Sequence, residues 1–500
     1  MKTGGVKKNG KGSRIRRKTG IVLLVSIAVL ILTAGFAAFH FISGRGRSIG
    51  EREWEKTPMT GLAAAEETGR GKGTGTTEEE GKEPEGMGQG SGETAEREEW
   101  EANPEEGVQE KSESEKLEQN KNGTGEAGLE ERKAEKEEEE RLAEEAEKII
   151  AGMELEEKVA QMFFVTPELI TGVSRVRAAG EWTKDALDRY PVGGLVYFAA
   201  NLENAQQTEE MLSTVQKYMM DEWGFPVFLG IDEEGGRVLR IGSNADFGVK
   251  KTEAMGTLAG KEEPEAAVRN AGNTIGAYLA ELGFNVDFAP DADVLTNEEN
   301  RVIGDRSFGK DPQSVAGLAW EFAQGLHDNG IMACYKHFPG HGGTVEDSHK
   351  GYAYSYKTWE ELAETELVPF QSGSENGIEF IMVSHISLPN FNGTDIPATL
   401  SASVVTGKLR EEMGYEGIII TDSMNMGAVS NHYEAGEAAV LAVQAGCDML
   451  LMSQGFEESY QAVLQAVEAG EITEDRINES VRRIMETKLK WRNSWLPLTP

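Results

Sequence analysis

Short apolar runs recur after residue 150, and longer amphipathic segments separate them. Many of the runs are rich in β-branched residues, which is typical of buried strands. There are eight runs: QMFFV (161–165), GGLVYF (193–198), PVFLGID (226–232), FNVDFAP (284–290), IMACYKHF (331–338), FIMVSHI (380–386), GIIITD (417–422) and CDMLLM (447–452). Intervening segments such as 262–283 and 312–330 have helical spacing and end in glycine. Strands that alternate with helices pair in parallel, so residues 148–495 are predicted to form an α/β fold, a (β/α)₈ TIM-type barrel.

Charged side chains stand at the ends of several runs. Asp232 ends the third run, Lys336 and His337 end the fifth, and Asp422 ends the seventh. Parallel strands of a barrel end at one rim, the C-terminal mouth, where barrel enzymes place their catalytic groups. A purely structural protein has no need of charges at one rim, so this pattern predicts an enzyme.

The first 42 residues have the pattern of a membrane anchor. Residues 1–20 are basic, and residues 21–42 contain no Asp, Glu, Lys or Arg. At about 1.5 Å per residue, this apolar run spans roughly 33 Å, which is enough to cross a bilayer. The basic flank predicts a single-pass transmembrane segment with the N-terminus inside and the barrel outside the cell membrane. A cleaved signal peptide is the alternative, although its apolar region usually has about 7 to 15 residues.

Residues 43–147 are rich in Glu and Gly and poor in aliphatic side chains. Such a segment buries too little apolar surface to offset chain entropy, so it is predicted to be a disordered acidic linker. Its last part, from residue 129, is predicted to be a solvated helix. The linker carries much of the formal net charge of −36, which argues against nucleic acid as a partner.

The segment KHFPGHGGTVEDSHKG, residues 336–351, contains three of the seven histidines. Within it, Asp347 and His349 are two residues apart, a spacing that in extended chain directs both side chains to one side. A carboxylate beside an imidazole fixes its tautomer and favours its protonated form, which suits a group that donates and regains a proton. Asp422, at the end of a buried run, is a candidate nucleophile, with capping of the next helix as the alternative.

A metal site is another interpretation of the same segment. His337, His341, His349 and Asp347 are all possible ligands. The spacings between the histidines match no common zinc pattern, and Lys336 would repel a cation. No metal and no cofactor is therefore expected. The only two cysteines, Cys334 and Cys447, lie in apolar runs and are expected to be free thiols, although an exported chain could pair them.

Several spaced motifs together resemble glycoside hydrolase family 3, and specifically its bacterial β-N-acetylglucosaminidases, also called β-N-acetylhexosaminidases. The motifs are KHFPGHG followed by DSH, IDEEGGRV, VIGDRSFG, PATLS and ITDSMNMGA, and the resemblance runs from residue 153 to near 490. It implies a retaining mechanism in which Asp422 is the nucleophile and His349, assisted by Asp347, is the general acid/base. It also implies that the sugar's hydroxyl and acetamido groups are held by Asp232, Arg240, Arg306, Lys336 and His337. Thr421 and Ser423 depart from the family's usual residues around the nucleophile, which leaves the fine specificity open.

The resemblance implies an exo-acting β-N-acetylglucosaminidase. In family 3 β-glucosidases a second domain usually contributes the acid, whereas here the DSH loop is the candidate, which favours N-acetylglucosamine over glucose. A linker would hold the barrel in the wall layer, so the expected substrate is a peptidoglycan fragment or muropeptide, and the protein is expected to be monomeric. The alternatives are a β-glucosidase, a phosphorolytic variant, a metal-dependent barrel hydrolase and a catalytically silent sugar-binding protein.

Overall fold

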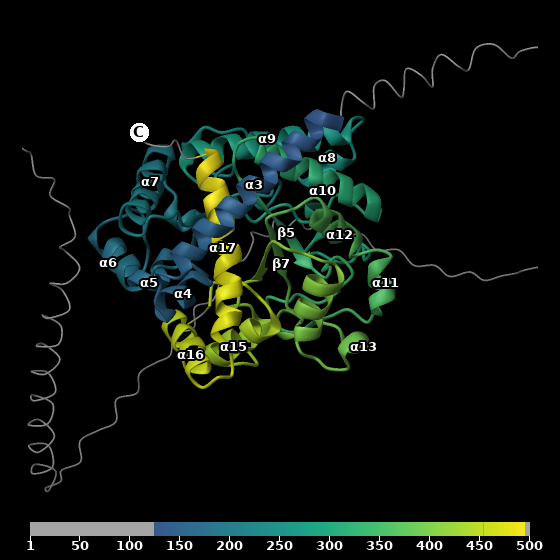
Figure 1. Cartoon of the computed structure of the whole chain (residues 1–500). Helices are drawn as coiled ribbons and strands as arrows, with labels where there is room; N and C mark the ends of the chain where they lie inside the picture. The colour runs from purple at the N-terminus through teal and green to yellow at the C-terminus, as the bar shows by residue number, and fades with distance from the viewer. Residues whose placement is uncertain (1–124, 454, 496–500) are drawn as a thin grey trace, which may run out of the picture. The chain divides into compact units, whose positions relative to one another are not determined.

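All eight predicted runs become strands of one parallel sheet in the computed structural model, which describes residues 125–453 and 455–495 (Figure 1). The strands are β1 Phe163–Val165, β2 Gly194–Val196, β3 Phe228–Ile231, β4 Val286–Asp287, β5 Met332–Phe338, β7 Phe380–Val383, β9 Ile418–Thr421 and β10 Leu450–Leu451. Their order in the sheet is β10-β1-β2-β3-β4-β5-β7-β9. A parallel bridge between Ile420 and Met449 joins the two ends of the sheet. The predicted (β/α)₈ barrel is therefore confirmed.

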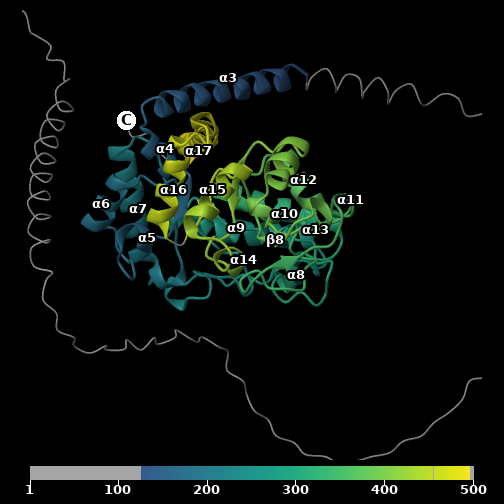
Figure 2. The same cartoon turned by 90° about the horizontal axis from the view of Figure 1, so that it is seen from below.

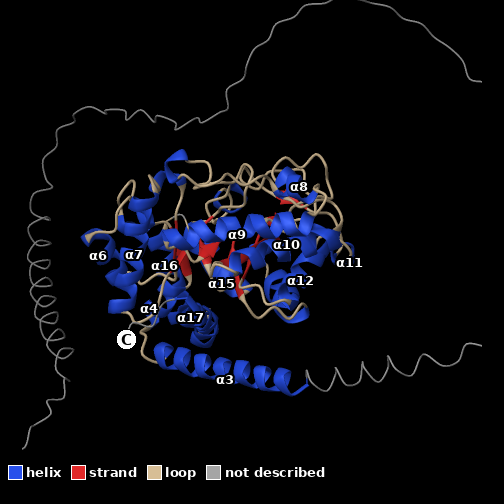
Figure 3. Cartoon of the chain, turned by 90° about the horizontal axis from the view of Figure 1, so that it is seen from above, coloured by secondary structure: helices blue, strands red, loops and turns tan. Residues whose placement is uncertain are grey.

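Helices surround the strands, and loops gather at one end of the barrel (Figure 3). The helices are α3 Gly125–Ile150, α4 Leu155–Gln161, α5 Pro167–Thr171, α6 Glu181–Arg189, α7 Ala205–Glu222, α8 Met255–Ala259, α9 Pro264–Leu282, α10 Pro312–His327, α11 Trp359–Ala363, α12 Val368–Glu375, α13 Pro389–Asn392, α14 Gly427–Ser430, α15 Ala435–Ala445, α16 Phe456–Glu468 and α17 Glu474–Trp495. A π-helix, Ser403–Glu412, takes the helical position between β7 and β9. Two short strands, β6 Ala353–Tyr354 and β8 Ile386–Ser387, pair outside the barrel.

Aromatic side chains fill the interior of the barrel. The ring of Phe164 lies 5.1 Å from that of Phe288 and 6.3 Å from that of Phe228, measured between centroids. A Cβ atom on Gly194 or Gly230 would come within 2.7 Å of the Phe164 ring, so only glycine fits beside it. The interior is thus a packed core, and a ligand can enter only at the rim.

The folded part of the chain begins earlier than the predicted residue 148. Helix α3 covers residues 125–150, which include the end of the predicted linker, and it lies across α17 (Figures 1 and 2). Leu142, Ala146 and Ile150 are buried there, so the predicted solvated helix has one covered face. Sequence reasoning noted the helix formers but missed this apolar face, because charged residues dominate the segment.

No helix in residues 125–495, as far as they are described, is long and apolar enough to cross a membrane. The predicted transmembrane span, residues 21–42, lies outside the described residues, as does the linker up to residue 124. Cys334 and Cys447 are both buried and free, as expected from their apolar runs.

Candidate active site

A cavity of about 430 Å³ lies at the C-terminal mouth of the barrel. Among the residues that line it are Asp232, Arg240, Arg306, Lys336, His337, His349 and Asp422. These are seven of the eight residues predicted for the site, and the eighth, Asp347, is hydrogen-bonded to His349. The closed barrel explains the convergence, because it brings strand ends that are far apart in sequence to one rim.

Asp422 follows β9 directly, and its backbone is fixed by the neighbouring strand. The Asp422 N–H donates to the carbonyl oxygen of Val383 at 2.8 Å, and the Ser423 N–H donates to Asp422 Oδ1 at 2.7 Å. Burial raises the pKa of Asp422, but the His337 and His385 rings and the Ser423 N–H outweigh it and hold the pKa below the ordinary value. The carboxylate is therefore ionised. The alternative, helix capping, is wrong for α14, which begins at Gly427 with Met426 at its N-cap.

Asp347 and His349 form the predicted pair, but in a turn and not in the expected extended chain, since the Lys350 N–H donates to the Asp347 carbonyl oxygen at 2.9 Å. Nδ1 of His349 lies 2.8 Å from Asp347 Oδ1, and the His349 backbone N–H donates to the same oxygen at 3.1 Å. Burial raises the pKa of Asp347, but hydrogen bonds from His349 and Lys350 outweigh burial and bring the pKa below its ordinary value. This carboxylate is therefore also ionised. An ionised acceptor keeps the proton on Nδ1, which leaves Nε2 to exchange a proton with a ligand.

His341 holds the base of the loop that carries this pair. Its Nε2 lies 2.9 Å from the hydroxyl of buried Ser348, and its Nδ1 lies 2.8 Å from the hydroxyl of Thr344. Ser348 is thus fixed between Asp347 and His349, while the His349 side chain is 64% exposed. His341 does not line the cavity itself, but its ring packs edge-on against that of His337 at 5.9 Å between centroids, so it is a positioning residue.

A buried ion network forms one wall of the cavity. Lys336 Nζ lies 2.9 Å from Asp232 Oδ1 and 2.5 Å from Glu234 Oε1. Arg306 holds the same Glu234 with two bonds, of 2.7 and 2.8 Å, and its Nε lies 3.2 Å from Asp291. Burial raises the pKa of Glu234, but Arg306 and Lys336 outweigh it and bring the pKa well below its usual range. Glu234 therefore fixes both cations at the rim.

We predict that Glu234→Gln lowers the free energy of unfolding by about 3–5 kcal/mol, because it leaves two buried cations without their shared counter-ion. Denaturant unfolding followed by circular dichroism measures this. The matched control is Glu253→Gln, which removes an exposed ion pair with Lys261 and should change stability by less than about 1 kcal/mol. Equal effects of the two substitutions would show that the network contributes no special stability.

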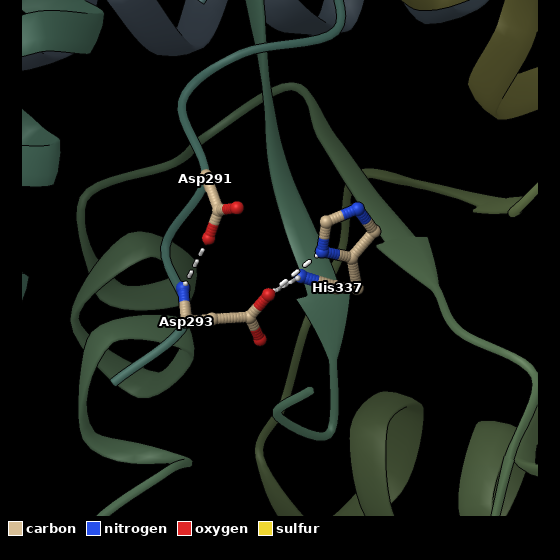
Figure 4. A group of neighbouring side chains, drawn as sticks. All are labelled: Asp291, Asp293 and His337. Atoms are coloured by element: carbon tan, nitrogen blue, oxygen red, sulfur yellow. Dashed lines mark hydrogen bonds and ion pairs between the residues drawn. The ribbon is translucent and has the colours of Figure 1, made fainter. Parts of the chain in front are cut away.

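His337 is oriented by Asp293, which lies on the loop after β4 (Figure 4). Its Nδ1 lies 2.7 Å from Asp293 Oδ2, so Nδ1–H donates and the Nε2 lone pair stays available. Nε2 lies 3.4 Å from Arg306 Nη2. Asp293 also accepts the His341 backbone N–H at 2.6 Å, and its own N–H donates to Asp291 at 3.1 Å. The carboxylate therefore fixes both the tautomer and the position of the His337 ring.

Asp291, Asp293 and His337 are also the one group among the described residues whose ligand atoms, within 4.8 Å of one another, could hold a metal ion. The donor chemistry does not favour an ion there. The Arg306 guanidinium contacts Asp291 and His337, and burial raises the pKa of Asp291 to about 7. These three side chains make a poor metal site, because the Arg306 cation already lies beside them and the Asp291 carboxyl is partly protonated near neutral pH. His341 and His349, the other histidines of the metal interpretation, do not join the group in the described residues.

We predict that stability falls by about 1–3 kcal/mol as the pH decreases from 6.5 to 4, because of His337. Burial, assisted by the charge of Arg306, lowers the pKa of His337 from 6.5 to about 4. The unfolded chain therefore binds more protons than the folded one in this window. Denaturant unfolding at both pH values should show a smaller fall for His337→Gln than for the wild type. Exposed His432→Gln is the control, and a fall of equal size in all three proteins would contradict the prediction.

Sequence reasoning missed several residues that shape the site. Glu234, Asp291 and Asp293 were visible only as acids near strand ends, because their partners Arg306 and His337 lie on other segments of the chain. His385, at the end of β7, donates from Nε2 to the Ser423 carbonyl oxygen at 2.9 Å and so positions the loop after Asp422. Arg237, an exposed residue at the rim of the cavity, donates to the carbonyl oxygens of residues 301–303 and thereby orders the loop that carries Arg306.

The chain is similar to known proteins both in sequence and in fold. The family described as "Glycosyl hydrolase family 3 N terminal domain" matches residues 154–487. The chain is 30% identical over 329 residues to beta-hexosaminidase A of Pseudoalteromonas piscicida, covering 61% of this chain and 54% of that protein. It is 35% identical over 274 residues to beta-hexosaminidase LpqI of Mycobacterium tuberculosis, covering 53% and 68%. A solved family 3 β-N-acetylglucosaminidase from Paenibacillus sp. str. FPU-7 superposes with a TM-score of 0.64 at 34% identity, covering 70% of this chain and 64% of that one. The chain thus spans about half the length of the first relative.

Proposed function

Because the chain belongs to glycosyl hydrolase family 3, we propose that it hydrolyses terminal β-linked N-acetylglucosamine from glycans with net retention. One observation carries the proposal: a single cavity brings the ionised Asp422 together with His349, which is paired to Asp347. A carboxylate and a proton-exchanging group at one sugar site are the two parts that retaining hydrolysis requires. Similar proteins named beta-hexosaminidase support N-acetylglucosamine as the sugar.

In the first step, an Asp422 carboxylate oxygen attacks the anomeric carbon and forms a covalent glycosyl-enzyme. His349 gives its Nε2 proton to the glycosidic oxygen, so the aglycone leaves as a neutral alcohol. In the second step, His349 takes a proton from water as that water attacks the anomeric carbon, and Asp422 is released. Asp347 stays ionised throughout and stabilises the charged imidazole.

The cavity wall supplies the groups for binding the sugar. Lys336, Arg306 and Arg240 are donors, while Asp232 and the Nε2 lone pair of His337 are acceptors. Their ion pairs hold these groups in place before a ligand arrives, which keeps the cost of ordering them low. Such a set matches a ring that carries several hydroxyl groups and an amide.

The defining experiment compares an aryl β-N-acetylglucosaminide with the matching aryl β-glucoside. Cleavage of the first in strong preference to the second is expected. Preference for the glucoside would favour the β-glucosidase alternative, and loss of activity in a chelator would favour the metal-dependent alternative. A comparison of products in phosphate and phosphate-free buffer distinguishes hydrolysis from phosphorolysis, since only the latter yields a sugar phosphate.

We also propose that the enzyme acts outside the cell membrane on peptidoglycan fragments. The support is the apolar run at 21–42 with its basic flank and the acidic segment that separates it from the barrel. Cell fractionation of the full chain and of a chain lacking residues 1–42 tests the anchor, because only the former should sediment with membranes. If the enzyme released no N-acetylglucosamine from muropeptide digests while cleaving other acetylglucosaminides, the proposed substrate would be wrong.

A further inference from the structure

Four aromatic side chains form a row on the surface beside the cavity. Tyr352, Tyr354 and Tyr356 alternate with the buried residues Ala353 and Ser355 along an extended segment. The ring centroids of Tyr354 and Tyr356 are 5.8 Å apart, and those of Tyr352 and Tyr354 are 6.1 Å apart. The exposed His432 stacks on Tyr352 at 4.0 Å, with the two planes 10° apart. We call these four residues the aromatic row.

The aromatic row is joined to the wall of the cavity by two chain segments that run side by side. One segment leaves from His349 and the other from Met426, and both residues line the cavity. The Gly427 N–H donates to the His349 carbonyl oxygen at 3.2 Å, and the Asn431 amide donates to that of Lys350 at 3.3 Å. The row therefore begins three residues beyond the group that is proposed to exchange the proton.

The backbone beneath the row is held in place. Strand β6 pairs with β8, with Ala353 opposite Ile386 and Tyr354 opposite Ser387. The Ser355 N–H donates to the Ser387 carbonyl oxygen at 3.0 Å. Tyr356 is nevertheless 63% exposed. Large, solvent-exposed aromatic rings on a fixed strand are typical of binding surfaces. A ligand that covers such rings costs little side-chain entropy, because the rings are already held in place.

We propose that the aromatic row binds the leaving-group side of the substrate, and that this side is a further β-linked sugar. The inference rests on the proposed function: the group that protonates the glycosidic oxygen must lie between the cleaved sugar and the leaving group. The row lies next to His349 and outside the cavity, where the chain beyond the cleaved bond must pass. Tyrosine offers an apolar ring and a hydroxyl, which match the C–H face and the hydroxyl groups of a pyranose. Burial and the charges of Asp395 and Glu346 raise the pKa of Tyr354, so carboxylates lie near the row and it fits a neutral ring better than an acidic peptide.

The test compares a β-1,4-linked N-acetylglucosamine trimer with the single-sugar aryl β-N-acetylglucosaminide, on the wild type and on Tyr354→Ala and Tyr356→Ala. For the trimer, kcat/KM should fall by roughly threefold to tenfold per ring removed, mainly through a higher KM. The fall for the aryl substrate should be clearly smaller. Trp182→Ala, which removes an exposed aromatic ring on α6, is the matched control and should change neither value.

Equal losses on both substrates, or no loss on either, would show that the tyrosines serve only to pack β6 against β8. Binding of the trimer to Asp422→Ala, with and without Tyr356→Ala, is measured by calorimetry and does not depend on turnover. Weaker binding in the double variant supports the row even if hydrolysis is absent, whereas unchanged binding overturns it. Absence of activity in the wild type alone would contradict the proposed function and not the row. Tighter binding of a stem peptide than of the trimer would overturn the choice of a sugar.

Discussion

Replacing Asp422 with alanine is expected to reduce kcat on an aryl β-N-acetylglucosaminide by about 10⁴-fold or more. The substitution removes the carboxylate proposed to form a bond with the anomeric carbon, while Asp232 and Glu234, two other carboxylates of the lining, are both held in ion pairs by Lys336. The position of this segment does not depend on the carboxylate alone. The Asp422 backbone is hydrogen-bonded to Val383, and the loop that follows it is hydrogen-bonded to His385. The folded cavity should therefore survive the substitution.

The measurement is the steady-state rate of aryl release, accompanied by a thermal unfolding curve for each protein. Asp221→Ala, which removes an exposed carboxylate on α7, is the control and should keep full activity. A second check is the covalent intermediate itself, which mass spectrometry of the wild type should detect with a slow substrate and which Asp422→Ala should lack. Retention of full activity by Asp422→Ala would make the mechanism stated above wrong.

Replacing His349 with alanine is expected to reduce kcat by about 10²- to 10⁴-fold on a substrate whose leaving group is a sugar. An alkoxide leaves poorly unless its oxygen is protonated, and Nε2 of His349 is the atom proposed to supply the proton. A nitrophenolate leaves readily without one, so the first step on a nitrophenyl substrate should be affected much less. The slow step should then become hydrolysis of the glycosyl-enzyme, which also needs His349 to accept a proton.

The comparison of leaving groups is the internal control for this prediction, because both substrates meet the same folded cavity. Rates on a series of aryl substrates should depend more steeply on the leaving-group pKa in His349→Ala than in the wild type. Asp347→Asn should show the same change in weaker form, since an amide cannot hold the Nδ1 proton as a carboxylate does. An equal loss across the whole series would indicate that His349 has a binding role and not an acid/base role.

The residues at the strand ends were open to prediction, because two local signals define them. A buried parallel strand appears as a short apolar run, and the polar residue that ends it must emerge at the mouth of a barrel. This reasoning was enough for Asp232, Lys336 and Asp422. The Asp347–His349 pair was predicted from the two-residue period of extended chain, but the structure forms it in a turn at residues 348–350, so the residues were right and the conformation was not.

The remainder of the site could not be predicted, because it depends on contacts between distant segments. Glu234 is separated from Lys336 by about a hundred residues and from Arg306 by 72, and neither partner is indicated by the local sequence. Asp293 contacts His337 from the loop after β4, and the local sequence does not indicate this pair either. The burial of Leu142 on α3 was not predicted, because the apolar positions of this helix are few and widely spaced. The charge and helix propensity of a segment are properties of that segment alone, whereas these contacts depend on which two segments the fold brings together.

Helix α3 sets a limit on how the barrel can be released from the rest of the chain. The family match starts at residue 154, yet Leu142, Ala146 and Ile150 are buried in the same core as the barrel. Under the proposed membrane anchoring, cleavage by a protease on the N-terminal side of α3 would release an intact barrel with α3 still packed on it. Cleavage after Ile150 would instead remove these three side chains from the core and expose the apolar surface that they cover, and exposed apolar surface of this kind promotes self-association. If the proposed anchor is correct, the acidic segment before α3 is thus where cleavage would convert a membrane-bound enzyme into a freely diffusing one.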